Sequence, residues 1–160
     1  MYTSKKIVGP EIAVRGEFTL SKEYLFINNK LKSLILNEDV DESVEYILGL
    51  LNSSLITYIH RRIAPPKDKG FFEVKTNIMG RLPIRTINFD DPNDVARHNL
   101  VVKFVEHMLQ LNKDLADANT PNAKQRIQRQ IAATDKQIDN LVYKLYDLTD
   151  DEIEIIKNSF

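Results

Sequence analysis

The sequence predicts an α+β fold: a small mixed β-sheet with a packed helix, followed by an antiparallel helical hairpin and a short C-terminal helix. Short β-rich groups separated by turn residues fill roughly the first 36 residues. Beyond residue 100 the apolar residues instead recur at heptad spacing, which is typical of paired helices. With 160 residues and 42% apolar side chains, the chain can bury one core and carry a helical extension. We expect an α/β domain over residues 1–94 and a helical region over residues 95–160.

Strands are expected in residues 6–36, where groups such as Ile12–Val14 and Tyr24–Ile27 are rich in β-forming side chains. Gly9-Pro10 and Asn28-Asn29 separate these groups, as turn residues do. One helix should follow, because apolar residues recur in steps of three and four over residues 44–59.

That helix should begin after Asp41–Ser43, which supply caps and first-turn acids, and end before Pro65. The next part of the chain is expected to be short and irregular. Its predicted elements are a basic turn at Lys67–Gly70, a strand at Phe71–Val74, a short helix at Lys75–Leu82, a strand at Pro83–Ile87 and a polar linker at Asp90–Asp94.

Two heptad stripes predict the helical hairpin. Apolar residues are spaced by three and four over residues 101–115 and again over residues 127–145. Thr120 and Pro121 separate the stripes as an N-cap and a first helical residue, which favours a turn over a single long rod. Thr149 and Glu152 form a capping-box pattern ahead of the last short helix.

Charge is distributed unevenly along the chain. The formal net charge is −1, yet residues 53–85 hold seven basic and two acidic residues, a local charge of +5. Such a window can attract a polyanion, while the acidic remainder limits non-specific adhesion.

We expect the basic window to contact double-stranded DNA. Arginine and lysine neutralise phosphates, arginine can pair with guanine, and asparagine can pair with adenine. The candidate DNA-binding residues are Arg61, Arg62, Lys67, Lys69, Lys75, Asn77, Arg81 and Arg85. Tyr58, Phe71 and Phe72 are interleaved with them, and His60 lies beside Arg61, where it would meet phosphate or helix carbonyls.

We predict neither catalytic nor metal-binding residues in this chain. Zero cysteines exclude disulfides, thiolate zinc sites and cysteine nucleophiles. Neither a glycine-rich methyl-donor turn nor an Asn-Pro-Pro-aromatic loop is present. One alternative stays open: Asp68, Glu73 and Lys75 follow the Asp…Glu-X-Lys order of metal-dependent nucleases, although their close spacing leaves little room for two separate strands.

Several blocks together resemble a known family. They are Tyr46–Leu55, the Gly-Phe-Phe of Gly70–Phe72, Asn77–Ile84, and Gln137–Thr149 with Glu152-Ile153. In this order they resemble the TaqI-like C-terminal specificity domain of Type II restriction-modification methyltransferases, over roughly residues 1–157. The first and third blocks also resemble those of Type I specificity subunits.

The resemblance implies a target recognition domain over residues 1–94 and a spacer or docking hairpin over residues 95–160. It also implies a longer protein, whose preceding part binds S-adenosylmethionine, methylates adenine and is sometimes fused to a nuclease. That catalytic part and double-stranded DNA would be the partners, and no cofactor would be bound by this chain itself. The family's motif positions are largely structural and do not identify the base contacts.

A different class of function is a protein-protein adaptor that works through the hairpin. The start of the chain lacks the apolar run of a signal peptide, and no stretch is apolar enough to cross a membrane. We therefore expect a cytoplasmic protein without a membrane partner.

Overall fold

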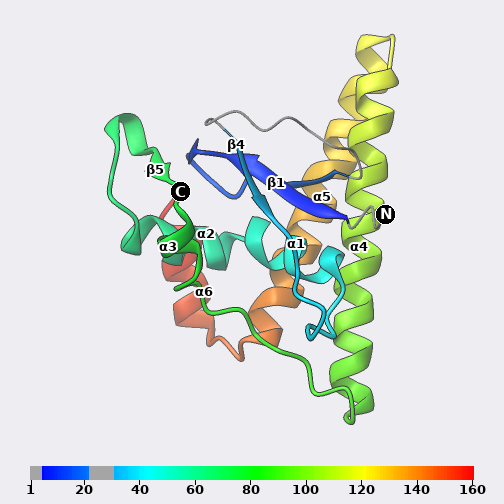
Figure 1. The fold of residues 1–160 in the computed structure, drawn as a ribbon. Helices are drawn as coiled ribbons and strands as arrows, with labels where there is room; N and C mark the ends of the chain where they lie inside the picture. The colour runs from blue at the N-terminus through cyan, green and yellow to red at the C-terminus, as the bar shows by residue number, and fades with distance from the viewer. Residues whose placement is uncertain (1–4, 22–30) are drawn as a thin grey trace.

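A central pair of helices organises the fold (Figure 1). The computed structural model describes residues 5–21 and 31–160, so the group Tyr24–Ile27, expected as a strand, lies outside the described residues. Helices α1 (Val44–Asn52) and α2 (Ser54–Ile63) follow each other in the middle of the molecule. Helix α1 contacts strands on one side and the long helix α4 (Pro92–Asp117) on the other. The predicted α+β class is confirmed.

Two small sheets cover the central helices. Strand β1 (Lys6–Pro10) lies between β3 (Thr19–Ser21) and β4 (Leu31–Leu34), and β2 (Ile12–Ala13) pairs with β5 (Phe72–Glu73). Every pairing among the described residues is antiparallel, whereas a mixed sheet was expected. The connection from β1 to β3 is too short for the crossover of a dozen or more residues that parallel strands need.

The helix expected over residues 44–59 is in fact two helices. Ser53 has an extended backbone (φ −67°, ψ 153°) and is both the C-cap of α1 and the N-cap of α2. Its hydroxyl donates to the Leu50 carbonyl at 2.7 Å and accepts from the Ile56 amide at 3.2 Å. These two bonds pair backbone groups at the helix ends that the interruption between α1 and α2 would otherwise leave unpaired. Helix α2 ends at Ile63, ahead of Pro65, as predicted.

The basic turn and the short helix after it are confirmed. A 3₁₀ turn, η1 (Asp68–Gly70), precedes β5, and α3 (Thr76–Met79) follows it. Lys69 and Gly70 both have positive φ, 58° and 77°, so the chain reverses sharply here. Strand β5 has two residues, which is shorter than the predicted Phe71–Val74.

The predicted strand at Pro83–Ile87 is wrong, because side chains rather than a neighbouring strand bind its backbone. The Arg85 carbonyl accepts from the Tyr46 hydroxyl at 2.9 Å, and the Arg85 amide donates to the Tyr146 hydroxyl at 3.0 Å. The Ile87 amide donates to a Glu42 carboxylate oxygen at 2.7 Å. The segment therefore belongs to no sheet.

The predicted linker at Asp90–Asp94 is also wrong. The Asp91 side chain accepts from the Asn93 amide at 2.9 Å and caps α4, and Pro92 is the first helical residue. Asp94 is buried in the first turn of that helix. The string of acids is thus a helix start and not a flexible connection.

The helical hairpin is confirmed, with α4 running antiparallel to α5 (Pro121–Leu145). The Thr120 side chain caps α5, and Thr149 with Glu152 forms the capping box of α6 (Asp150–Lys157). None of the helices within residues 5–21 and 31–160 is long and apolar enough to cross a membrane.

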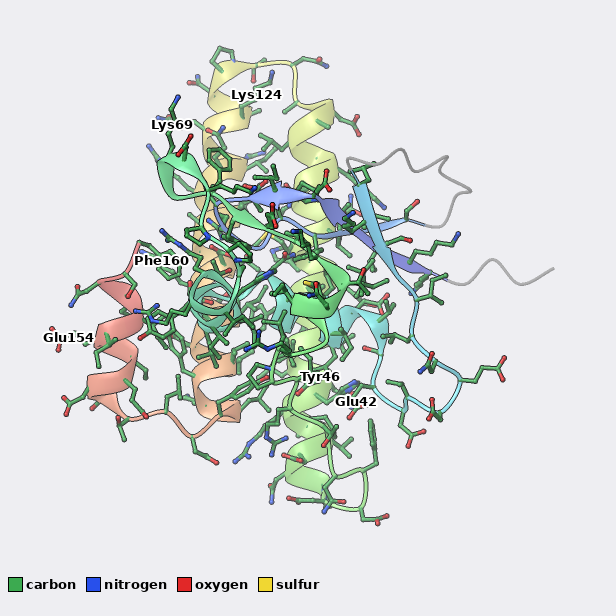
Figure 2. The ribbon with its side chains drawn as sticks, turned by 60° about the vertical axis from the view of Figure 1, so that its left-hand side comes forward. Glu42, Tyr46, Lys69, Lys124, Glu154 and Phe160 are labelled. Atoms are coloured by element: carbon green, nitrogen blue, oxygen red, sulfur yellow. The ribbon has the colours of Figure 1, made fainter. Side chains whose placement is uncertain are left out.

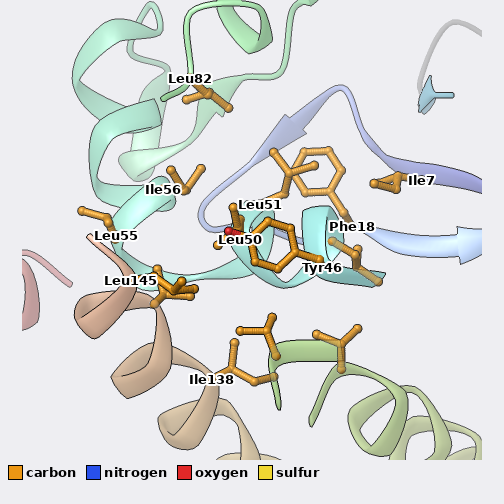
Figure 3. Packing of buried hydrophobic residues seen from close by; sticks show 14 of the residues in the cluster. Ile7, Phe18, Tyr46, Leu50, Leu51, Leu55, Ile56, Leu82, Ile138 and Leu145 are labelled. Atoms are coloured by element: carbon orange, nitrogen blue, oxygen red, sulfur yellow. The ribbon is translucent and has the colours of Figure 1, made fainter. Parts of the chain in front are cut away.

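One hydrophobic core joins the sheets, the central helices and the hairpin (Figure 3). Where α1 crosses α4, a Cβ on Gly49 would lie 2.8 Å from Val105 Cγ2 and 2.9 Å from Val101 Cγ1, so glycine allows the helices their close approach. Ile138 and Val142 of α5 are buried in the same core. The division of the chain at residue 94 stays a prediction. Because the heptad residues Val101 and Ile138 are buried in this core, they are not free to form the surface of a protein-protein adaptor.

Candidate nucleic-acid interface

The end of α2 presents two arginines, whose positive charge suits the C-terminus of a helix. Arg62 is exposed, with its guanidinium carbon 3.4 Å from the centre of the Tyr58 ring. Arg61 is partly buried; it donates to the Ser159 carbonyl at 3.4 Å and lies 5.5 Å from the centre of the Phe160 ring. Among the described residues neither arginine has a carboxylate partner.

The chain between α2 and α3 carries three lysines in two different states. Lys67 and Lys75 each place Nζ 2.5 Å from an oxygen of Glu73. These ammonium groups, Lys67 above all, hold the pKa of the Glu73 carboxyl below its ordinary value. Lys69 is exposed on η1 and forms no ion pair with any residue that the structure describes. Figure 2 shows it on a projecting turn.

His60 fastens this turn to α2 and does not face solvent. It is 2% exposed, its ring lies 4.5 Å from the ring of Phe72, and Nε2 lies 3.2 Å from the Glu73 carbonyl oxygen. Burial lowers the pKa of His60, so the neutral ring with its proton on Nε2 suits this bond. The expected contact of His60 with phosphate or helix carbonyls is therefore wrong.

Asn77 and Arg81 are exposed on α3 and just after it, on the chain that continues from Lys75. The structure thus places seven of the candidates around the end of α2, the basic turn and α3. They are Arg61, Arg62, Lys67, Lys69, Lys75, Asn77 and Arg81.

Arg85 is arranged differently. Its guanidinium donates to both oxygens of Asp94, at 2.8 Å and 3.0 Å, and the Asp94 side chain is 7% exposed. This bidentate bond holds the pKa of Asp94 below its ordinary value. Because its donors already bind the buried carboxylate of Asp94, Arg85 links its own segment to α4 and does not present a free charge.

The nuclease alternative finds little support in this geometry. The Glu73 carboxylate is bound by two lysines, and Asp68 lies in the exposed turn η1. Within residues 5–21 and 31–160 no group of three or more histidines and carboxylates could hold a metal ion. A metal would have to displace both ammonium groups from Glu73.

Each of the five glycines has a different local environment. Gly9 faces the Phe18 ring, Gly16 lies against the Leu51 carbonyl, and Gly49 faces α4. The other two are Gly70, in the basic turn, and Gly80, which caps the C-terminus of α3. The glycines are thus spread over the fold and serve turns, a helix cap and close packing.

Leu51-Asn52-Ser53, within the block Tyr46–Leu55, has a structural role, as the resemblance implied. Asn52 accepts from the Phe18 amide and donates to the Phe18 carbonyl, both at 2.8 Å. Ser53 separates α1 from α2 by capping both helices. The block therefore sets where α2 points, and with it where Arg61 and Arg62 lie.

Sequence reasoning identified these basic residues but did not distinguish the free ones from the paired ones. Tyr58 and Arg62 are four residues apart, so their stacking could have been predicted from helical spacing. The pairing of Arg85 with Asp94 could not have been predicted in this way, because Asp94 was expected in a polar linker.

Comparison with known proteins addresses the resemblance directly. Residues 1–84 match the TaqI-like C-terminal specificity domain. In this chain these residues include both sheets, α1, α2, the basic turn and α3. No curated protein matches the chain. The match does not extend to the tail block at residues 137–153, whose similarity stays a prediction. Domains of this kind serve DNA sequence recognition in restriction-modification and are not the catalytic part. With more than half of its length matched, this chain belongs to the family of TaqI-like C-terminal specificity domains.

Proposed function

We propose that the chain recognises a specific double-stranded DNA sequence for an adenine methyltransferase, or for a fused restriction and methylation enzyme. The catalytic part would lie in the same polypeptide, bind S-adenosylmethionine there, and act on DNA in the cytoplasm. One observation carries the proposal: seven of the candidate residues lie at the end of α2, in and beside the basic turn, and at α3, inside the residues that match the specificity family.

We call this cluster the basic surface. Its members are Arg61, Arg62, Lys67, Lys69, Lys75, Asn77 and Arg81. Arg62 and Lys69 have no acidic partner among the described residues, so their full charge is available to phosphates. Lys67 and Lys75 share one Glu73, so these three residues together contribute about one positive charge.

The stacking of Arg62 on Tyr58 favours a defined contact. A guanidinium held flat against a ring loses less side-chain freedom on binding than a free one. Its N–H groups lie in the plane of the guanidinium, where they can meet a phosphate or the edge of guanine.

The substitution Arg62→Gln with Lys69→Gln tests this surface. If each residue neutralises one phosphate, the slope of log affinity against log salt should become shallower by up to about 1.8. Between 50 and 200 mM salt, the parent protein should then lose roughly twelvefold more affinity for a duplex than the variant does. Fluorescence anisotropy with a duplex of about 20 base pairs measures both quantities.

The matched control is Lys103→Gln with Lys144→Gln. Both lysines are exposed and lie outside the basic surface. The control should keep the slope of the parent protein. Equal slopes in all three proteins, or absence of duplex binding by the parent protein, would contradict the proposal.

A further inference from the structure

The first half of α5 carries a second basic segment, outside the residues that match the family. Residues 118–134 hold Lys124, Arg126 and Arg129 and no acidic residue. All three side chains are exposed. Exposed amides accompany them: Asn122, Gln125, Gln128 and Gln130.

These three bases have no ion-pair partner among the residues that the structure describes, although acids lie on both neighbouring segments. On α4, Asp114 accepts from Gln110 at 2.8 Å, and Asp117 pairs with none of the three. Further along α5, Asp135 is bound by Arg15 at 3.0 Å, and Asp139 accepts from the Ser54 amide and hydroxyl at 2.7 and 2.6 Å. The positive charge of the segment is therefore not neutralised within the fold.

Packing fixes the side of α5 that faces the core, and the three bases lie on both flanks of that side, because Lys124 is about 160° around the helix from Arg126. Ile127 and Thr134 are buried, so the bases and amides face solvent on the rest of the helix. Arg126 and Arg129 are three residues apart and are neighbours on one face. Residues 121–134 extend over about 21 Å of helix, long enough to follow several phosphates.

The hairpin end lies at the same end of the molecule as the basic turn. Figures 1 and 2 differ by a rotation about the vertical axis, and in both the η1 turn and the end of the hairpin project upwards. Figure 2 labels the two sites by Lys69 and Lys124. A duplex bound to the basic surface can thus extend toward the first half of α5.

We infer that the first half of α5 is a second contact surface for the sugar-phosphate backbone of the same DNA duplex. The inference rests on the proposed function and adds to it a contact outside the matched residues. Lys124, Arg126 and Arg129 neutralise phosphates, and the glutamines donate to phosphate oxygens, so this contact adds affinity without choosing a sequence.

The chemistry of the segment favours DNA over an acidic protein. Central contacts between proteins usually need buried aromatic or large apolar anchors. The exposed side chains of residues 121–134 are polar or small, and none is aromatic. Basic and amide groups without apolar anchors are what a phosphate backbone requires.

The test is Lys124→Gln with Arg126→Gln and Arg129→Gln. Glutamine keeps helix propensity close to that of lysine and arginine, so the helix should persist, as circular dichroism would show. The salt slope for a long duplex should become shallower by up to about 2.7. Between 50 and 200 mM salt, the parent protein should lose roughly 40-fold more affinity than this variant.

A matched control removes the same charge elsewhere, with Lys103→Gln, Lys144→Gln and Lys157→Gln, all exposed and away from this segment. The inference holds if the first triple variant loses slope and the control does not. Equal losses would show a net-charge effect and would overturn it. An unchanged slope in the first triple variant would also overturn it, including the case in which this variant instead loses binding to the separately expressed catalytic part.

The pair Arg62→Gln with Lys69→Gln separates this inference from the proposed function. If that pair reduces the slope while the α5 triple variant does not, the second surface is wrong and the proposed function stands. If the parent protein does not bind a duplex, both fail.

Discussion

At the scale of single residues, polar side chains hold the basic surface in place. Asn52 binds both backbone groups of Phe18, and His60 binds the Glu73 carbonyl. Arg85 binds Asp94 with two hydrogen bonds. Each of these bonds ties a loop or a short strand to a helix. Since such segments have few ladder bonds of their own, these side chains set where the exposed lysines and arginines lie.

His60 should make stability depend on pH. Burial lowers its pKa in the folded protein, so below about pH 6.5 the unfolded chain binds a proton that the folded chain resists. The stabilising contribution is therefore complete above that pH and is lost as the pH falls through 6.5 and below. We expect the free energy of unfolding to fall in this range, as urea denaturation at successive pH values would measure.

The variant His60→Gln provides the comparison. Glutamine can still donate to the Glu73 carbonyl, but it does not titrate. The difference in stability between the parent protein and the variant should therefore shift in favour of the variant as the pH drops from 7.5 to 5.5, a range of about one unit on either side of 6.5. A constant difference over this range would show that His60 is not held neutral in the fold.

The sequence shows which residue types can bind DNA but not which of them are free to do so. Arg62 and Arg85 look alike in the sequence, yet one is exposed on a tyrosine and the other is bound to Asp94. The difference depends on a contact between the 83–87 segment and α4. A contact of this kind arises from tertiary packing, which residue type and local spacing do not determine.

At the scale of elements, helices with strong local signals were predicted well. Thr120 with Pro121 and Thr149 with Glu152 mark helix starts in the sequence, and both starts are confirmed. The signal at Ser53 was hidden, because the apolar spacing continues across the break between α1 and α2. The false strand at residues 83–87 has β-forming side chains, but tyrosine hydroxyls and a carboxylate bind its backbone.

The crossing of α1 and α4 should be sensitive to Gly49→Ala. Alanine gains about 1 kcal/mol of helix propensity over glycine, whereas overpacking a core typically costs about 1–3 kcal/mol. Because two valine methyls lie less than 3 Å from the new Cβ, we expect overpacking to outweigh the gain in helix propensity. The free energy of unfolding should fall by about 1 kcal/mol. Thermal unfolding should show a midpoint lower by roughly 2–4 °C.

Val105→Ala supplies the matched test of this contact. It removes one of the two methyl groups nearest to the new Cβ. In a double-mutant cycle, Gly49→Ala should cost less in the Val105→Ala background than in the parent protein, by about 0.5–1 kcal/mol. Additive effects would mean that α1 and α4 do not depend on this close approach.

At the scale of the whole molecule, one core joins residues inside and outside the family match. Val101, Val105, Ile138 and Val142 pack with the residues of α1 and α2. The hairpin is therefore attached to the recognition part through buried contacts as well as through the chain. This arrangement gives the basic surface and the first half of α5 a defined spacing, which suits contact with a stiff duplex.

The uneven charge distribution also belongs to this scale. The net charge is −1, but residues 53–85 carry a local charge of +5, and residues 118–134 carry three bases and no acid. Such an arrangement attracts DNA locally while the acidic remainder reduces non-specific adhesion.

The central claim is that the chain recognises a DNA sequence, and selection from a random duplex library with the purified protein tests it most directly. The account predicts that one short sequence is enriched, and that changing a single base pair within it lowers affinity by about fivefold or more. The Arg62→Gln with Lys69→Gln variant should lose affinity for selected and unselected duplexes. Equal affinity for all sequences would contradict the claim.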